Sequence, residues 1–248
     1  MNADLYTGRA PEAIRSSWAQ FLEQTTIGDV WRRPGLDVRT RSLITVAALA
    51  TQRCDSELRI ELPMALDHGV TELELGESMV QVAAYAGLAS GRLGLRVLSE
   101  LFGDQRGVPP AGLTTRHTGD RLTRARAVLA ELRPDLSAGP PPGMKPPLPF
   151  ALPWNSWLMQ AAFGDLWNRP HLTLVDREWV TFGSLVALGH EFELEAHIRT
   201  THYLGIAPEE VREAIIHLAA YVGFSSGGRA IRLASGVFDE LSPDRKDS

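Results

Sequence analysis

Two long apolar runs, residues 40–52 and 176–188, dominate the hydrophobic pattern of the chain. They read TRSLITVAALATQ and DREWVTFGSLVAL, and both are long enough to form a buried helix. Their valine and threonine content leaves a strand as the alternative, although no hairpin turn sequence flanks either run. Mixed segments at 55–69 and 191–205 follow, and each closes on a glycine, the usual stop signal of a helix. The pattern therefore predicts an all-α fold.

Local signals place further helix boundaries. Thr71 and Glu74 have the spacing of a capping box, and Pro208 suits the first turn of a helix. Additional helices are expected at residues 90–102, 119–133 and 226–238. The stretch 137–153, SAGPPPGMKPPLPFALP, is dense in proline, which removes backbone donors and blocks helices. We expect a linker there.

An internal repeat without gaps relates residues 28–102 to residues 164–238, an offset of 136 (164 minus 28). Of the 75 aligned positions, 23 are identical, which chance does not produce without gaps. The match predicts a tandem duplication of one helical domain. We divide the chain into a first repeat at 10–105, a helix with the proline-rich linker at 106–150, and a second repeat at 151–242.

Composition narrows the class of protein. Hydrophobic residues make up 44% of the chain, which suffices for a core, and the net charge of −5 shows no basic footprint for nucleic acid. Cys54 is the single cysteine, so no internal disulfide, CxxC redox pair or thiolate metal cage is possible. No signal-peptide pattern opens the sequence, and no apolar run spans a bilayer. We expect a cytoplasmic protein without a membrane partner.

The candidate chemistry lies in the second repeat. Glu193 and His197 are four residues apart and share one helix face, as do His217 and Tyr221 on the next helix. If these two helices pack antiparallel, the four side chains converge on one pocket. The first repeat has Glu57, Glu61, Gln81 and Tyr85 at these positions, so both histidines are missing there.

Simpler interpretations compete with this pocket. A Glu–His pair at this spacing is common on solvated helix faces, and the two tyrosines suit packing with a bonded hydroxyl. The paired tryptophans, including Trp31 and Trp167, suit core anchors or a pocket wall. His190, Glu193 and His197 are acceptable metal ligand types, but their HxxExxxH spacing differs from that of zinc proteases.

Longer motifs in both repeats resemble the gamma-carboxymuconolactone decarboxylase family. The first repeat carries GDVWRRPGLDVRTRSLITVAALA and ELRIELPMALDHGVTELELGESMVQVAAYAG, and the second carries GDLWNRPHLTLVDREWVTFGSLVALG and ELEAHIRTTHYLGIAPEEVREAIIHLAAYVGF. The resemblance implies an all-α fold, oligomeric rings, and catalysis without a metal or organic cofactor. A tandem chain would fill such a ring as a trimer, a pseudo-hexamer.

Site roles follow from the same resemblance. Its E-L-x-x-H motif matches Glu193 and His197, and its [HQ]-x-A-x-Y motif matches His217 and Tyr221. We expect His197 as the acid/base, Glu193 as its orienting partner, and His217 with Tyr221 as stabilisers of a developing enolate. Residues Trp167, Tyr85, Glu57 and Gln81 are expected to contact a small-molecule substrate. The first repeat departs at Glu61, and both repeats lack the proline that usually follows the final Y-x-G.

The expected activity is therefore decarboxylation, a double-bond shift or lactone opening on a small unsaturated lactone or carbonyl compound. The alternative is a non-catalytic binding or scaffold protein that kept the fold. The contrast between repeats favours an enzyme with one working site per chain, because a decayed protein would lose polar pocket residues from both copies.

Overall fold

The computed structural model describes residues 4–7, 10–103, 115–137 and 148–242. Within those ranges every regular element is a helix and no strand occurs, so the all-α prediction is confirmed. Helix α1 (Asp4–Thr7) precedes the first repeat, which contains α2 (Glu12–Phe21), the π-helix η1 (Leu22–Trp31), α3 (Val38–Thr51), α4 (Asp55–Asp67), α5 (Glu72–Ala86) and α6 (Leu88–Phe102).

The second repeat has the same order of α- and π-helices, with the short 3-10 helices η2 and η4 in addition. It contains η2 (Pro149–Ala151), α9 (Leu152–Leu158), the π-helix η3 (Met159–Asp165), η4 (Leu166–Asn168), α10 (Leu174–Leu188), α11 (Glu191–Tyr203), α12 (Pro208–Val222) and α13 (Phe224–Leu241). Two helices lie between the repeats, α7 (Arg121–Leu132) and α8 (Pro134–Ser137). Helical structure resumes at Pro149, earlier than the predicted linker allowed, because proline is tolerated in a first helical turn. Residues 138–147 of that linker lie outside the described residues.

The predicted helix starts agree with the observed caps. The Thr71 backbone N–H donates to Glu74 over 2.8 Å, and the Glu74 backbone N–H donates to the Thr71 hydroxyl over 3.2 Å. This reciprocal pair satisfies two backbone donors that a helix start otherwise leaves unpaired. Pro208 occupies the first turn of α12, and Gly69 and Gly205 follow α4 and α11 with positive φ.

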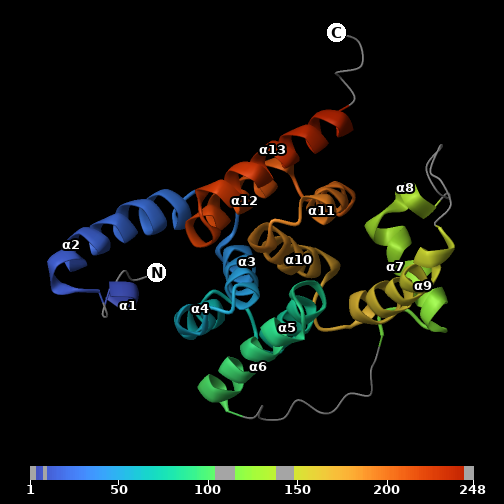
Figure 1. The fold of residues 1–248 in the computed structure, drawn as a ribbon, viewed down its shortest axis with the longest axis horizontal. Helices are drawn as coiled ribbons and strands as arrows, with labels where there is room; N and C mark the ends of the chain where they lie inside the picture. Colours follow the sequence, from blue (N-terminus) through green and yellow to red (C-terminus); the bar gives the residue numbers. More distant parts are fainter. Residues whose placement is uncertain (1–3, 8–9, 104–114, 138–147, 243–248) are drawn as a thin grey trace, which may run out of the picture.

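The two repeats are interleaved around α3 and α10, which lie against each other at the centre (Figure 1). Helix α12 packs against α3 of the other repeat, and α5 packs against α10. The core around α10 to α13 accordingly includes Ile44 and Ala48 from α3, and the core around α3 to α6 includes Val180 from α10. Neither repeat therefore completes its core alone.

Close approach of α3 and α10 depends on one glycine. A Cβ on Gly183 would lie 2.8 Å from the carbonyl oxygen of Ile44 and 3.4 Å from the Cβ of Ala47. Ala47 and Gly183 are equivalent positions of the repeat. The two central helices thus meet at matched, small residues.

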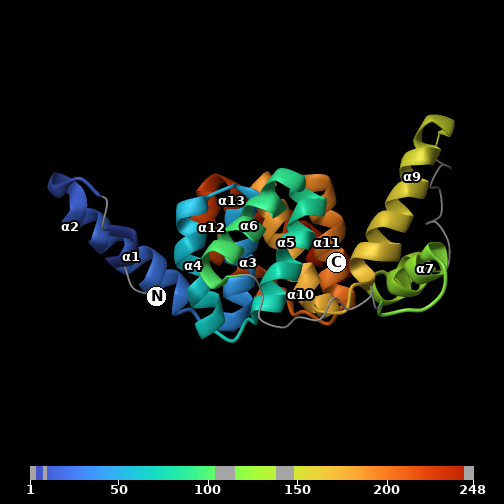
Figure 2. The ribbon, with the colours of Figure 1, turned by 90° about the horizontal axis from the view of Figure 1, so that it is seen from below.

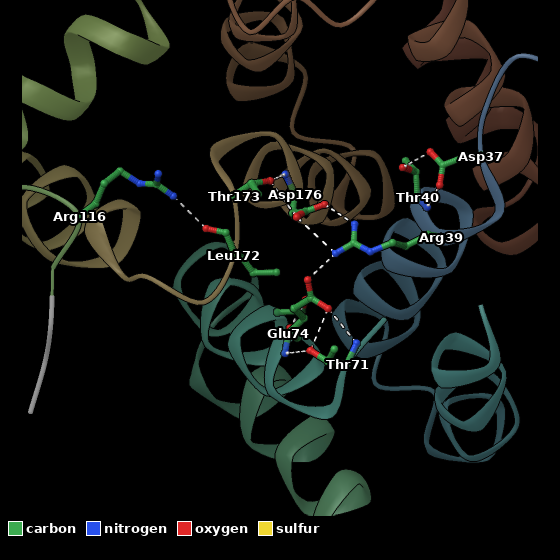
Figure 3. Close-up of polar contacts among 10 residues, drawn as sticks. Asp37, Arg39, Thr40, Thr71, Glu74, Arg116, Leu172, Thr173 and Asp176 are labelled. Carbon is green, nitrogen blue, oxygen red and sulfur yellow. Dashed lines mark hydrogen bonds and ion pairs between the residues drawn. The ribbon is translucent and has the colours of Figure 1, made fainter. Parts of the chain in front are cut away.

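Arg39 forms a polar bridge between the repeats at the ends of these helices (Figure 3). Its guanidinium donates to Asp176 of α10 over 2.6 Å and to Glu74 of α5 over 2.5 Å. Both acids also serve as helix-start partners, Glu74 for Thr71 and Asp176 for Thr173. One side chain of α3 therefore ties α5 to α10.

Two helical arms, α2 and α9, extend from opposite sides of the central bundle (Figure 2). Helix α7 packs along η3, and Gly164 permits this because a Cβ there would lie 2.4 Å from the Arg121 carbonyl oxygen. Trp154 and Trp157 on α9 are both exposed, with ring centroids 5.3 Å apart. The arms present aromatic surface beyond the core.

Candidate active site

Interleaving of the repeats creates two equivalent polar sites, each built from both copies. We call the first the histidine site and define it by Glu178 and His197, with Trp167 and with Tyr85 of the other repeat. We call the second the glutamate site and define it by Trp31, Glu61 and, from the other repeat, Tyr221. Helices α5 and α12 deliver the tyrosines because each packs on the opposite repeat.

The histidine site centres on a buried carboxylate–imidazole pair. Nδ1 of His197 lies 3.0 Å from each carboxylate oxygen of Glu178. The Glu178 side chain is fully buried, whereas that of His197 is 15% exposed. Because a carboxylate only accepts, Nδ1 carries the hydrogen and Nε2 remains available to a substrate. The pair therefore fixes the tautomer and the ring plane.

Two aromatic residues enclose His197. Its ring stacks on Trp167 at 6.0 Å and meets the edge of Tyr85 at 5.5 Å. The Trp167 indole N–H donates to the Tyr85 hydroxyl oxygen over 3.0 Å. Burial raises the pKa of the Tyr85 phenol, so that it stays protonated and can donate a hydrogen bond. Trp167 is fully buried, and it is both a core anchor and the floor of the site.

Gln81 of α5 belongs to a buried hydrogen-bond network with α10. Its amide oxygen accepts from Arg177 over 3.0 Å, and its amide nitrogen donates to Thr181 over 3.0 Å. Gln81 and Arg177 are fully buried. We predicted Gln81 as a substrate contact, but these partners make it part of the supporting network.

The predicted convergence of four residues in the second repeat does not occur. Glu193 is exposed, and the carboxylate that orients His197 is Glu178 of α10. His217 and Tyr221 lie in the glutamate site. The prediction assumed that α11 and α12 face each other within one repeat, whereas α12 packs on α3 and His217 contacts Arg41 and Thr45 there.

In the glutamate site Glu61 occupies the position of His197. One carboxyl oxygen accepts from Tyr221 over 3.0 Å and also from Tyr6 of α1. Trp31 donates to the Tyr221 hydroxyl over 2.8 Å, as Trp167 does to Tyr85. The other oxygen of Glu61 is buried and has no hydrogen-bond partner among the described residues. Burial raises the pKa of Glu61 even though the two phenols favour its charged form.

The carboxylate has changed places between the two sites. Glu178 corresponds to Ser42 in the first repeat, and His197 corresponds to Glu61. Ser42 instead contacts Nδ1 of His68 over 2.8 Å. In the aligned repeats, the carboxylate and the imidazole of the second copy both replace other residues of the first. Comparing these two positions in the sequence would have indicated the Glu178–His197 pair.

His217 is a buried, neutral structural residue. Its Nδ1 lies 3.4 Å from Arg41, which only donates, and its Nε2 lies 2.7 Å from the Thr45 hydroxyl. Burial and the charge of Arg41 hold the pKa of His217 well below its ordinary value. The ring therefore donates from Nε2 to Thr45 and is unsuited to proton exchange with a ligand.

A cavity of about 270 Å³ adjoins the glutamate site. Its lining residues are Tyr6, Trp18, Leu22, Thr26, Ile27, Leu49, Cys54, Glu57, Ala220 and Tyr221. Glu57, predicted as a substrate contact, thus faces this cavity and not the histidine site. Its counterpart Glu193 is an exposed residue of α11.

The metal alternative finds no support in the geometry. Across the described ranges, no three His, Cys, Asp or Glu side chains gather closely enough to hold a metal ion. His190, the first residue of the HxxExxxH spacing, is exposed at the start of α11, while His197 faces Glu178.

Fold and site together define a tandem all-helical protein with a histidine–carboxylate site shared between its repeats. The model of the carboxymuconolactone decarboxylase family matches residues 17–100 and again residues 153–235. The chain belongs to this family, and the double match confirms the tandem duplication. In the part of the chain that the structure describes, no helix is both long and apolar enough to span a bilayer.

Relatives include enzymes with different substrates in their names. The chain is 38% identical over 92 residues to the 4-carboxymuconolactone decarboxylase of Acinetobacter baylyi, covering 37% of this chain and 69% of that protein. It is 38% identical over 89 residues to the nitrosuccinic acid decarboxylase npaB of Metarhizium robertsii, and this match covers 36% of this chain and 57% of that protein. An uncharacterized 15.0 kDa protein of Paracoccus denitrificans is 29% identical over 99 residues, and this match covers 39% of this chain and 74% of that protein.

Proposed function

We propose that the chain is a cofactor-independent decarboxylase-type lyase whose working centre is the histidine site. The observation that supports this most directly is the His197–Glu178 pair, in which a fully buried carboxylate orients a partly exposed imidazole. A buried carboxylate is costly unless it is paired, and His197 is the partner that Glu178 has here. The names of two relatives support decarboxylation as the reaction.

The substrate is a small carboxylic acid with a carbonyl, lactone or equivalent electron-accepting group next to the carboxylate-bearing carbon. Breaking the carbon–carboxylate bond releases carbon dioxide and leaves its electron pair on the substrate as an enolate. Tyr85 donates its phenolic hydrogen bond to the enolate oxygen, where such a donor stabilises developing charge. His197 delivers a proton from Nε2 to carbon and is then reprotonated from water.

Glu178 acts through His197. The carboxylate stabilises the imidazolium before proton delivery and keeps Nδ1 protonated afterwards, so Nε2 alone exchanges with the substrate. The same group can move a double bond, by removing a proton at one carbon and returning it at another. Double-bond shift and lactone opening are therefore alternative outcomes at the same site.

The competing proposal is a non-catalytic binding or scaffold protein. Its support is the glutamate site, in which the imidazole is replaced and Glu61 is locked against two tyrosines. The intact histidine site favours the enzyme, since a scaffold has no need of a buried carboxylate that is held against one imidazole.

We also propose that the chain assembles as a trimer. The arm α9 and the short helix η2 before it support this assembly, because Trp154, Trp157 and Phe150 expose 58%, 57% and 97% of their surface. Large exposed apolar groups of this kind mark protein–protein contacts. Light scattering after size exclusion tests the proposal, and a monomer at micromolar concentration would contradict it.

The experiment for the reaction is a carbon dioxide release assay with carboxymuconolactone and, separately, with nitrosuccinate. We expect release from one of them by the native chain and by His202→Ala, which removes an exposed histidine of the same helix α11. We expect His197→Ala to lose it. Absence of release from both compounds would discard the named substrates.

A further inference from the structure

We propose that the cavity beside Glu61 is a second ligand site, which takes a small organic ammonium ion. The cavity has a volume of about 270 Å³ and lies between the first arm, the start of α4 and the end of α12. None of its lining residues belongs to the histidine site, so the proposal stands independently of the proposed reaction.

Aromatic rings form one part of the wall. Tyr6, Trp18 and Tyr221 come from three different helices and all line the cavity. The Trp18 indole N–H donates to the Tyr6 carbonyl over 3.3 Å, and its ring stacks on Phe21 at 5.8 Å. Aromatic faces attract cations, and quaternary ammonium groups are recognised by boxes of such rings.

The charge of the wall is negative. Among the described residues that line the cavity, Glu57 is the charged side chain, and none is a lysine, arginine or histidine. Glu61 lies directly behind the wall, bonded to Tyr6 and Tyr221. Burial and the charge of Glu57 raise the pKa of the Cys54 thiol. Burial and the charge of Glu61 raise the pKa of the Tyr6 and Tyr221 phenols. A cation offsets this negative potential, and an anion adds to it.

Size limits the occupant further. The volume lies just below the usual range for drug-sized ligands, roughly 300–1,000 Å³, so a single ring or a trimethylammonium alcohol fits better than a larger molecule. Leu22, Ile27 and Leu49 supply apolar contacts for its methyl groups. The site is specific to the first repeat, because Cys54 and Glu57 correspond to the exposed His190 and Glu193.

Three probes of the same shape test the charge preference. Choline is cationic, 3,3-dimethylbutan-1-ol is its neutral counterpart, and 3,3-dimethylbutanoate is anionic. Cys54 is the single cysteine of the chain and lines the cavity, so its alkylation by iodoacetamide reports occupancy in the full-length protein. We expect choline to slow alkylation at a concentration about fivefold or more lower than the neutral alcohol requires, which is the ratio that a cation–π contact supplies. We expect the anion to give no protection.

Matched variants assign the effect to the cavity. Glu57→Gln is expected to remove the preference for choline over the neutral alcohol, while Glu193→Gln, the equivalent change on the exposed face of α11, retains it. Trp18→Leu is expected to weaken protection by choline, and Trp18→Phe to restore part of it. Equal protection by all three probes, no protection by choline, or a charge preference that survives Glu57→Gln would each overturn the proposal.

Discussion

Nδ1 of His197 lies 3.0 Å from both carboxylate oxygens of Glu178, and the two residues come from adjacent helices of the second repeat. The pair is completed by Tyr85, which the first repeat contributes. The histidine site is thus divided between the two copies of a duplicated chain. The equivalent division in the other direction gives the glutamate site, where Glu61 stands at the position of His197.

Glu178→Gln is expected to reduce kcat by roughly 10² to 10⁴, because an amide no longer stabilises the imidazolium or enforces the Nδ1–H tautomer. The substrate contact is unchanged, so KM should move little. Steady-state kinetics with the substrate identified by the release assay provide the measurement. The control is Glu193→Gln, at the position that the sequence alone favoured. Its kcat should stay within about twofold of the wild-type value, far below the roughly 10²-fold or larger effect of losing an acid–base group. The reverse order of effects would contradict the assignment.

Tyr85→Phe is expected to lower kcat by about 10²-fold, since the enolate loses its hydrogen-bond donor. Stability should also fall by roughly 1–3 kcal/mol, because the buried Trp167 N–H loses its acceptor. Tyr203→Phe is the control, as Tyr203 lies at the end of α11 against Arg133. Activity of Tyr85→Phe equal to that of the control would show that the first repeat takes no part in the reaction.

Glu61→Gln should change how stability depends on pH. Burial raises the pKa of Glu61 in the folded chain above its value in the unfolded chain, so the folded state retains a proton that the unfolded state releases. Wild-type stability therefore declines as pH rises from about 4, the ordinary range of glutamate, towards the folded pKa. The glutamine variant should match the wild type near pH 4 and exceed it at pH 7 in urea unfolding. Parallel curves over this range would refute the expectation.

Gly183→Ala is expected to destabilise the fold by about 1–3 kcal/mol, because the added methyl group would press on the Ile44 carbonyl and force α3 from α10. Gly236→Ala in α13 is the matched control. Its added Cβ meets no atom within 4 Å, and alanine favours a helix over glycine by roughly 0.5–1 kcal/mol. Thermal unfolding of the pair should move in opposite directions. A stability of Gly183→Ala at or above the wild type would contradict the central packing.

The hydrophobic pattern predicted the helices well, because each has a local cause. The capping box at Thr71 and the proline at the start of α12 act within one turn. The exceptions lie at the start of each repeat. No helix was predicted for α2, η1, η3 and η4, and proline-rich composition suggested a linker where η2 begins at Pro149 and leads into α9. Composition alone does not separate a proline that blocks a helix from one that begins it.

The site was harder to predict because its geometry is not local. Helical spacing placed Glu193 and His197 on one face, yet the carboxylate that contacts His197 is 19 positions earlier, on α10. Spacing within one repeat also gave no sign that α12 packs on α3, which moves His217 away from His197. Comparing the two copies position by position was the more informative signal, since His197 and Glu178 differ from their counterparts together.

The most direct test of the shared histidine site is the kcat of His197→Ala for decarboxylation, measured with and without added imidazole. We predict a loss of roughly 10² to 10⁴, the usual contribution of a general acid, with partial recovery when imidazole supplies the missing group. Recovery by a small molecule separates a chemical role from a folding defect. Turnover by His197→Ala at the wild-type rate would contradict the account.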